Sequence, residues 1–200
     1  IHDRIMKLVS DWQAIPDITF INSYFDHEDL IDIFADNARK MNHQDYDHFV
    51  FSFHGVPQRQ LVKADHNNCC LQSEACCQLL SDKNHLCYSA QCHATARGIA
   101  QKLALDNNRY TISFQSRLGP EKWTQPYTSE VLENLAEKGT KKVLVFSPAF
   151  VADCLETTIE IGYEYKEEFI EKGGEKLDLV PSLNDDPRWI DLIYQIITSQ

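Results

Sequence analysis

This 200-residue sequence has no long apolar run and few basic residues, and it has almost no cysteine outside one short segment. No stretch approaches the ~18 apolar residues that a membrane-spanning helix requires, so we predict no transmembrane segment. Its 19 Lys and Arg residues stand against 30 Asp and Glu, giving a formal net charge of −11. That balance argues against nucleic acid as the main partner and suits a small molecule or a metal cation.

The sequence also lacks an initiator methionine, a leader peptide, an internal repeat and low-complexity tracts. It opens with IHDRIMKLVSDW, residues 1–12, whose apolar spacing is typical of the later part of an amphipathic helix. We therefore expect a portion of a longer protein, so the missing leader says nothing about localisation. A hydrophobic content of 43% is sufficient for one well-packed domain.

Six of the seven cysteines lie between residues 69 and 92, in CCLQSEACCQLLSDKNHLCYSAQC, and Cys154 is the seventh. Disulfide scaffolds usually distribute their cysteines along the chain, so this crowding favours a reducing, cytoplasmic environment. The spacing matches neither common ferredoxin pattern. From the residues alone, an iron–sulfur cluster, a zinc site and disulfides all stay open.

Short apolar segments alternate with helical patterns along the chain. Strands are predicted at 18–23, 48–53, 110–116, 141–147 and 177–181. Helices are predicted at 27–41, 89–105, 128–139, 153–173 and 185–198. This alternation predicts an α/β fold, a doubly wound parallel sheet with helices on both faces. Ligands bind beyond the carboxyl ends of the strands in such sheets, so the site is expected there.

Three predicted strand ends carry candidate site residues. His54 ends strand 48–53 and is followed by Gly55, which permits close approach of a backbone or ligand. After strand 141–147, Glu156, Glu160 and Glu164 are spaced four apart, which places them on one face of a helix. Such a row is commonly a solvated acidic face, although a divalent cation would relieve its repulsion.

The third strand end leads into the loop QSRLGPEKWTQPYT, residues 115–128. It presents Arg117, Trp123 and Tyr127, either as an ordinary connection or as an aromatic wall for a flat, acid-bearing ligand. Together the three strand ends indicate a metal ion that meets a planar, apolar ligand with acidic side chains.

Four segments resemble the ferrochelatase family: FVFSFHGVP, QSRLGPEKWTQPYT, FSPAFVADCLETTIEI and PSLND. The resemblance extends over nearly the whole chain. It implies residues 1–200 to be the C-terminal portion of a two-lobed enzyme, mostly its second Rossmann-like lobe, with a Cys-rich insert at 65–92. The expected activity is insertion of ferrous iron into protoporphyrin IX or coproporphyrin III in haem biosynthesis. Most of the N-terminal half would be missing, and peripheral membrane contact stays open.

The resemblance also implies roles for individual residues. His54 and Glu156 match the family's essential histidine and its paired acid, and both are candidate iron ligands. Glu160 and Glu164 match an acidic row for iron or protons, on a helix with a π-type distortion in known members. The expected substrate-binding residues are Trp123, Phe150, Asp153 and Arg117. The sequence departs from many members at Cys154, where they have a second histidine.

We favour proton removal from the porphyrin by His54, with iron delivery as the alternative role. Two other functions compete: a cobalt or nickel chelatase of tetrapyrrole synthesis, and a non-catalytic porphyrin or iron–sulfur sensor. Some bacterial ferrochelatases carry a cysteine-rich [2Fe–2S] insert similar to this one. That resemblance implies Cys70, Cys77, Cys87 and Cys92 as cluster ligands, with Cys76 as the substitute.

Overall fold

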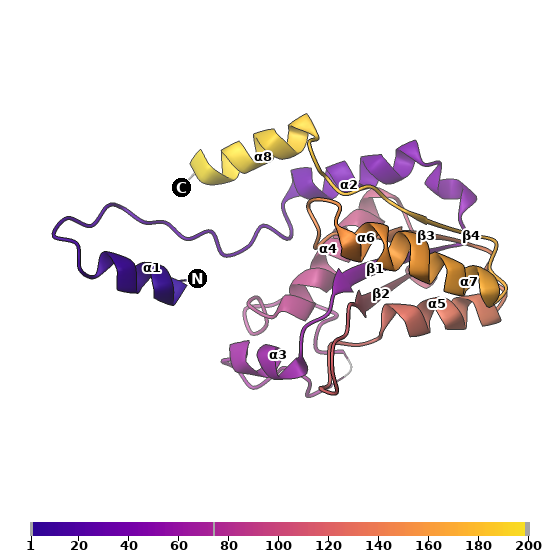
Figure 1. Ribbon diagram of the computed structural model, residues 1–200, viewed down its shortest axis with the longest axis horizontal. Coiled ribbons are helices and arrows are strands. Elements are labelled where there is room, and N and C mark those ends of the chain that lie inside the picture. Colours follow the sequence, from indigo (N-terminus) through magenta and orange to yellow (C-terminus); the bar gives the residue numbers. More distant parts are fainter. Residues whose placement is uncertain (1, 74, 199–200) are drawn as a thin grey trace.

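Within residues 2–73 and 75–198, which the structure describes, four apolar segments form one parallel sheet in the computed structural model (Figure 1). The strands are β1 (His48–His54), β2 (Tyr110–Gln115), β3 (Lys142–Phe146) and β4 (Lys176–Leu179). Their order is β2-β1-β3-β4, and every pairing is parallel. All carboxyl ends therefore meet at one edge, as the sequence predicts.

Side chains of β1 alternate between the two faces of the sheet. Phe49, Phe51 and Phe53 belong to the larger core cluster, whereas Val50 belongs to the smaller one. Phe51 is fully buried and stacks on Phe146 of β3 with ring centroids 4.7 Å apart. The unbroken apolar run of β1 is thus explained by burial on both faces.

Helices cover both faces, which confirms the predicted doubly wound α/β fold (Figure 1). α2 (Glu28–Lys40), α4 (Tyr88–Lys102) and α8 (Pro187–Thr198) pack on the phenylalanine face. α5 (Thr128–Glu137) and α7 (Lys166–Glu171) pack on the valine face. The short 3₁₀ helices are η1 (His43–Asp45) and η2 (Asn107–Arg109).

The single helix predicted at 153–173 is divided into three parts. α6 (Leu155–Thr158) leads into a π-helix, η3 (Glu160–Tyr165), which continues as α7. The Glu164 N–H donates to the Ile159 carbonyl at 2.9 Å, a bond that spans five residues. Glu160 begins the π-helix and is half-buried, whereas Glu164 lies four residues further on and is exposed. The π-type distortion implied by the resemblance is confirmed.

Two local predictions are wrong. The segment 18–23 is not a strand: it runs as irregular chain away from the sheet, and Ile21 is 41% exposed (Figure 1). Its apolar alternation has no strand to pair with, and strand preference depends on such context. The second error is an omission, since α3 (Gln58–Ala64) follows the turn after β1.

The first predicted helix, 1–12, forms as α1 (His2–Val9). The described residues leave out residue 1, residue 74 of the Cys-rich insert at 65–92, and residues 199 and 200 at the end of the predicted unit 1–200. No helix in the described part of the chain is long and apolar enough to cross a membrane.

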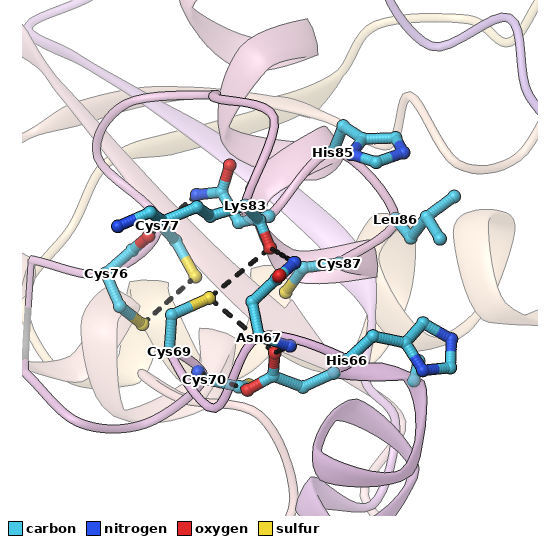
Figure 2. A pocket seen from close by; sticks show the side chains of 13 residues that line it. His66, Asn67, Cys69, Cys70, Cys76, Cys77, Lys83, His85, Leu86 and Cys87 are labelled. Carbon is cyan, nitrogen blue, oxygen red and sulfur yellow. Dashed lines mark hydrogen bonds between the residues drawn. The ribbon is translucent and has the colours of Figure 1, made fainter.

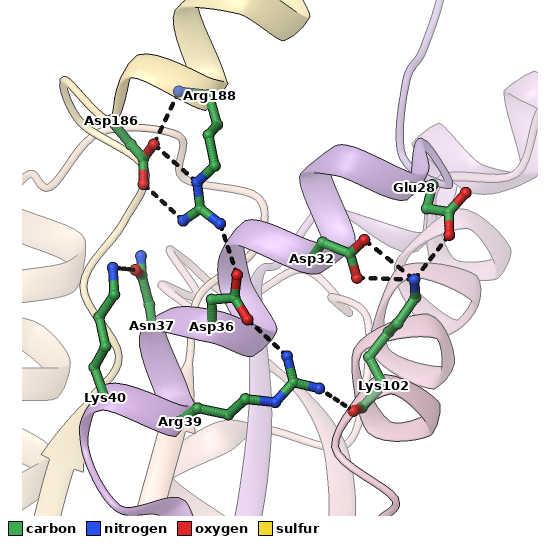
Figure 3. A network of polar contacts seen from close by, with 9 residues as sticks. All are labelled: Glu28, Asp32, Asp36, Asn37, Arg39, Lys40, Lys102, Asp186 and Arg188. Carbon is green, nitrogen blue, oxygen red and sulfur yellow. Dashed lines mark hydrogen bonds and ion pairs between the residues drawn. The ribbon is translucent and has the colours of Figure 1, made fainter.

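A network of ion pairs ties α2 to its neighbours on the outer surface (Figure 3). The Asp36 carboxylate of α2 forms ion pairs with the guanidinium groups of Arg39 and Arg188, each with an N–O distance of 2.7 Å. Lys102 at the end of α4 contacts Glu28 and Asp32 at 2.8 and 2.9 Å. These groups are solvent-accessible, so each pair adds little stability beside the apolar core.

Candidate active site

The carboxyl ends of β1 and β2 lie side by side and define the site. His54 ends β1 and is in register with Gln115, the last residue of β2. The Gly55 N–H donates to the Gln115 carbonyl at 2.8 Å. A Cβ at Gly55 would lie 2.9 Å from that carbonyl oxygen and 3.2 Å from the Trp123 ring, so glycine is required by close approach.

Hydrogen bonding fixes the tautomer of His54. Its Nδ1 lies 2.6 Å from the carbonyl oxygen of Gly55. Because a carbonyl oxygen only accepts, Nδ1 carries the proton, and the neutral ring keeps a free lone pair on Nε2. Two aromatic side chains are neighbours of the ring, with centroids 6.4 Å away for Trp123 and 6.0 Å away for Phe150. Nε2 is therefore free to take a proton or a metal ion.

Glu156 is held ionised beside this histidine. A hydrogen bond from the Cys154 thiol is the main reason that the pKa of Glu156 lies below its ordinary value, and a positive charge on His54 lowers it further whenever that ring is protonated. Burial, and then the same carboxylate, raise the pKa of Cys154, so the thiol stays protonated and donates. Cys154 is the N-cap of α6, which sets its position relative to Glu156.

Glu160 is fixed by four donors. Its carboxylate accepts from Ser116 N–H at 2.9 Å, Ser116 Oγ at 2.5 Å, Gln115 Nε2 at 3.2 Å and Tyr165 Oη at 2.7 Å. These donors come from the end of β2 and from the end of the π-helix itself. The carboxylate is therefore immobilised where the π-helix passes the strand end.

Gln115 was not assigned a role from the sequence, although it joins several parts of the site. Its Oε1 accepts from Ser52 Oγ at 2.7 Å. Its Nε2 donates to the Glu156 carbonyl at 2.7 Å as well as to Glu160. The available signal was its position as a polar residue at the end of a buried strand.

Three other predicted site residues lie apart from His54. Glu164 is exposed on the π-helix. The Arg117 guanidinium lies over the Tyr127 ring, 4.5 Å from its centroid. Asp153 accepts from Asn184 Nδ2 at 2.8 Å and from Ser182 N–H at 3.3 Å.

The contacts of Asp153 explain its protonation state. Partial burial opposes its ionisation, but the hydrogen bonds from Asn184 and Ser182 prevail and hold the pKa of Asp153 below its ordinary value. This side chain therefore anchors the turn at 182–184.

The cysteine loop forms a second cluster (Figure 2). A cavity of about 20 Å³ is lined by Cys69, Cys70, Cys76, Cys77 and Cys87. The Cys76 and Cys77 sulfur atoms are 3.6 Å apart. Cys87 makes side-chain hydrogen bonds with both Cys70 and Cys77. All seven cysteines of the chain are free thiols.

Cys87 is the most acidic thiol of the loop. A hydrogen bond from Cys77 lowers the pKa of Cys87 to about 6, and backbone N–H groups at the start of α4 assist. Burial raises the pKa of Cys70 to about 12, so that thiol stays protonated. A thiolate is the form of cysteine that binds metals, and Cys87 offers one at neutral pH.

Cys92 stands apart from the other loop cysteines. It is 4% exposed on α4 and lines a different, apolar pocket together with Phe53 and Tyr88. The structure thus brings Cys70, Cys77 and Cys87 together with Cys76 around one cavity, whereas Cys92 lines the other pocket. Among the described residues, no three His, Cys, Asp or Glu side chains stand in ready metal-binding geometry.

Comparison with known proteins shows the family of the chain. The ferrochelatase family profile matches residues 1–200. The ferrochelatase of Pseudomonas entomophila (strain L48) is 47% identical over 175 residues, which are 86% of this chain and 52% of that protein. The ferrochelatase of Pseudomonas fluorescens (strain Pf0-1) is 47% identical over 189 residues, 94% of this chain and 55% of that protein.

The ferrochelatase of Pseudomonas putida (strain W619) is 44% identical over 190 residues, 92% of this chain and 56% of that protein. The chain thus spans about half the length of the curated relatives it matches.

Proposed function

The chain belongs to the ferrochelatase family, and we propose from this premise that its complete gene product inserts ferrous iron into a porphyrin in haem biosynthesis. The observation that carries the proposal is His54: its Nε2 lone pair is free, Trp123 and Phe150 are aromatic neighbours of its ring, and Glu156 close by is ionised. Flat aromatic rings suit a planar macrocycle, and the base and carboxylate suit metal exchange for protons.

Iron insertion releases two protons, because Fe²⁺ replaces two pyrrole hydrogens. His54 Nε2 takes one pyrrole proton, and the second leaves by way of the acidic row. Nδ1–H keeps its bond to Gly55, so the resulting imidazolium needs a nearby anion. Glu156 supplies that charge, since the Cys154 hydrogen bond keeps it ionised. Glu156 also offers hard oxygen ligands to the incoming ferrous ion. Iron delivery by His54 is the competing role.

The acidic row provides a path away from the reacting centre. Glu160 is fixed at the strand end by its four donors, and Glu164 is exposed one step further along the π-helix. We propose that protons or ferrous iron move along this path. Arg117 is exposed and meets the carboxylates of the porphyrin, while Asp153 supports the pocket through the turn at 182–184.

The test is anaerobic insertion of Fe²⁺ into protoporphyrin, followed by the loss of porphyrin fluorescence, in the complete gene product. His54→Ala is expected to lower the rate at least about a hundredfold. His43→Ala, at the opposite end of the sheet, serves as the matched control and should retain the wild-type rate. Coproporphyrin in parallel assays separates the two candidate substrates.

Other outcomes would redirect the proposal. Porphyrin binding without turnover in the wild type and in both variants would exclude the enzyme and favour a sensor. Insertion of cobalt or nickel in place of iron would favour the related chelatase.

We further propose that the cysteine loop holds a [2Fe–2S] cluster with a structural or sensory role in a cytoplasmic enzyme. Support comes from the donor chemistry, because five thiols line one cavity and Cys87 is acidic enough to bind metal as a thiolate. The cavity of about 20 Å³ holds little more than one water molecule, so the loop must open to admit a cluster. Irregular structure between α3 and α4 permits such opening.

Cys70, Cys77 and Cys87 are the first three proposed ligands, and Cys92 or Cys76 supplies the fourth. Iron, acid-labile sulfide and zinc should be measured in anaerobically purified protein, together with the visible absorption of the cluster. Single Cys→Ser variants identify ligands by loss of bound iron, and Cys154→Ser is the matched control outside the loop. One zinc ion per chain without sulfide would contradict the cluster.

A further inference from the structure

Tyr88 physically joins the cysteine loop to the candidate active site. It is the first residue of α4 and directly follows Cys87, the thiol that contacts both Cys70 and Cys77. Its hydroxyl donates to the backbone carbonyl of His54 at 2.8 Å. One residue thus connects a loop thiol to the backbone of the histidine at the strand end.

The surroundings of Tyr88 leave its ring little freedom. It packs against the main core cluster and lines an apolar pocket of about 190 Å³ beside Phe53 and Cys92. Burial raises the pKa of Tyr88, so the hydroxyl stays protonated and remains a donor to His54.

Cys87 is equally constrained on the loop side. Its N–H donates to the Asn84 carbonyl at 2.8 Å, and its own carbonyl accepts from the Gln91 N–H at 3.0 Å. Cys87 therefore belongs both to the loop and to the first turn of α4. A change in the thiol contacts of Cys87 displaces the start of α4, and Tyr88 moves with it.

We propose that Tyr88 is a positioning residue that makes the orientation of His54 depend on the state of the cysteine loop. His54 needs this support because its ring is oriented by the carbonyl of the next residue, Gly55, whose backbone depends on that of His54. The regulatory meaning rests on the proposed function, but the physical coupling does not.

The first measurement compares wild type, Tyr88→Phe and Tyr110→Phe in the complete gene product. Tyr88→Phe keeps the ring and removes only the hydroxyl. We expect kcat for iron insertion to fall about three- to tenfold with KM for porphyrin unchanged, the range of one neutral hydrogen bond. Tyr110→Phe, whose hydroxyl contacts Asn107 at the far end of β2, should match the wild type. An unchanged kcat in Tyr88→Phe would overturn the proposal.

The second measurement follows amide hydrogen exchange of residues 54–56 and 58 in a cycle of Cys87→Ser, Tyr88→Phe and the double variant. Each single change should speed exchange there severalfold, and the double variant should exchange no faster than Tyr88→Phe. Additive effects would overturn the coupling. Cys77→Ser replaces Cys87→Ser if the latter does not fold.

The two measurements distinguish the two proposals. A wild type without iron insertion would contradict the proposed function, while the exchange cycle would still decide whether Tyr88 couples the loop to His54.

Discussion

The strand-end site and the cysteine loop lie close together but are built in different ways. His54 and Gln115 end paired strands that are buried along most of β1 and over the last half of β2, so the sheet fixes their positions. The described residues between α3 and α4 form no strand, and single turns and a few side chains hold them. Asp65 accepts from the N–H groups of Asn67 and Cys70, and Asn84 donates to two loop carbonyls.

This difference separates precise chemistry from adaptable binding. Proton transfer needs groups held within a fraction of an ångström, which a buried sheet provides. A loop held by a few hydrogen bonds opens at low cost in free energy, and thiols that must close around a metal group need that freedom. The following changes test this contrast, from the largest expected effect to the smallest.

Phe51→Ala should be the most damaging change, because it removes a fully buried ring stacked on Phe146 at the centre of the sheet. We expect a loss of about 3–5 kcal/mol in the free energy of unfolding. Urea denaturation followed by circular dichroism measures it. A loss under ~1 kcal/mol would show that the sheet is not the rigid element of the pair.

Gly55→Ala should disturb the strand end without unfolding the sheet. The new Cβ would lie 2.9 Å from the Gln115 carbonyl and 3.2 Å from the Trp123 ring, so the turn must shift. We expect a cost of about 1–3 kcal/mol and at least tenfold slower iron insertion. Gly162→Ala is the matched control, since its Cβ would meet the Thr157 carbonyl at an ordinary 3.5 Å. Equal effects of both alanines would contradict close approach as the cause.

Asn84→Ala should loosen the loop alone. Its buried side chain accepts from the Ser81 N–H at 2.7 Å and donates to the carbonyls of Cys76 and Leu79, each at 2.9 Å. We expect about tenfold faster thiol alkylation of Cys76 and Cys77, with under ~1 kcal/mol lost globally. Mass spectrometry of the alkylated peptides gives the rates. Unchanged rates would mean that the loop is as rigid as the strand end.

Asp36→Asn should have the smallest effect, because the network of Figure 3 is on the surface. Partial burial opposes ionisation of Asp36, but hydrogen bonds from Arg39 and Arg188 prevail and lower its pKa below 3.8. Its stabilising contribution is therefore present above pH 3.8 and is lost as the pH falls through the lowered value.

We accordingly expect Asp36→Asn to cost at most ~0.5 kcal/mol at neutral pH, and less in high salt, because the side chains are solvent-accessible. Thermal unfolding of wild type and variant across acidic pH should show the two curves converging. A difference that persists at low pH would point to packing instead of charge.

Much of this architecture can be predicted from the sequence, because buried strands and helices have recognisable patterns of apolar residues. Four of five predicted strands form, since β-branched and aromatic runs buried on both faces are distinctive. The segment 18–23 carries the same signal but finds no neighbouring strand. The division of the helix at 153–173 was not derivable from its apolar spacing, because Glu160 reaches donors at Ser116 and Gln115, some 45 residues away.

By itself, the sequence determined the α/β alternation, the placement of His54 at a strand end and the crowding of cysteines into one insert. All of these follow from local order along the chain. Only the tertiary structure decided that Gln115 and Ser116 hold Glu160, that Cys92 faces a different pocket from Cys87, and that Tyr88 reaches the His54 carbonyl. Such contacts depend on distances between distant segments, which packing sets and residue spacing does not record.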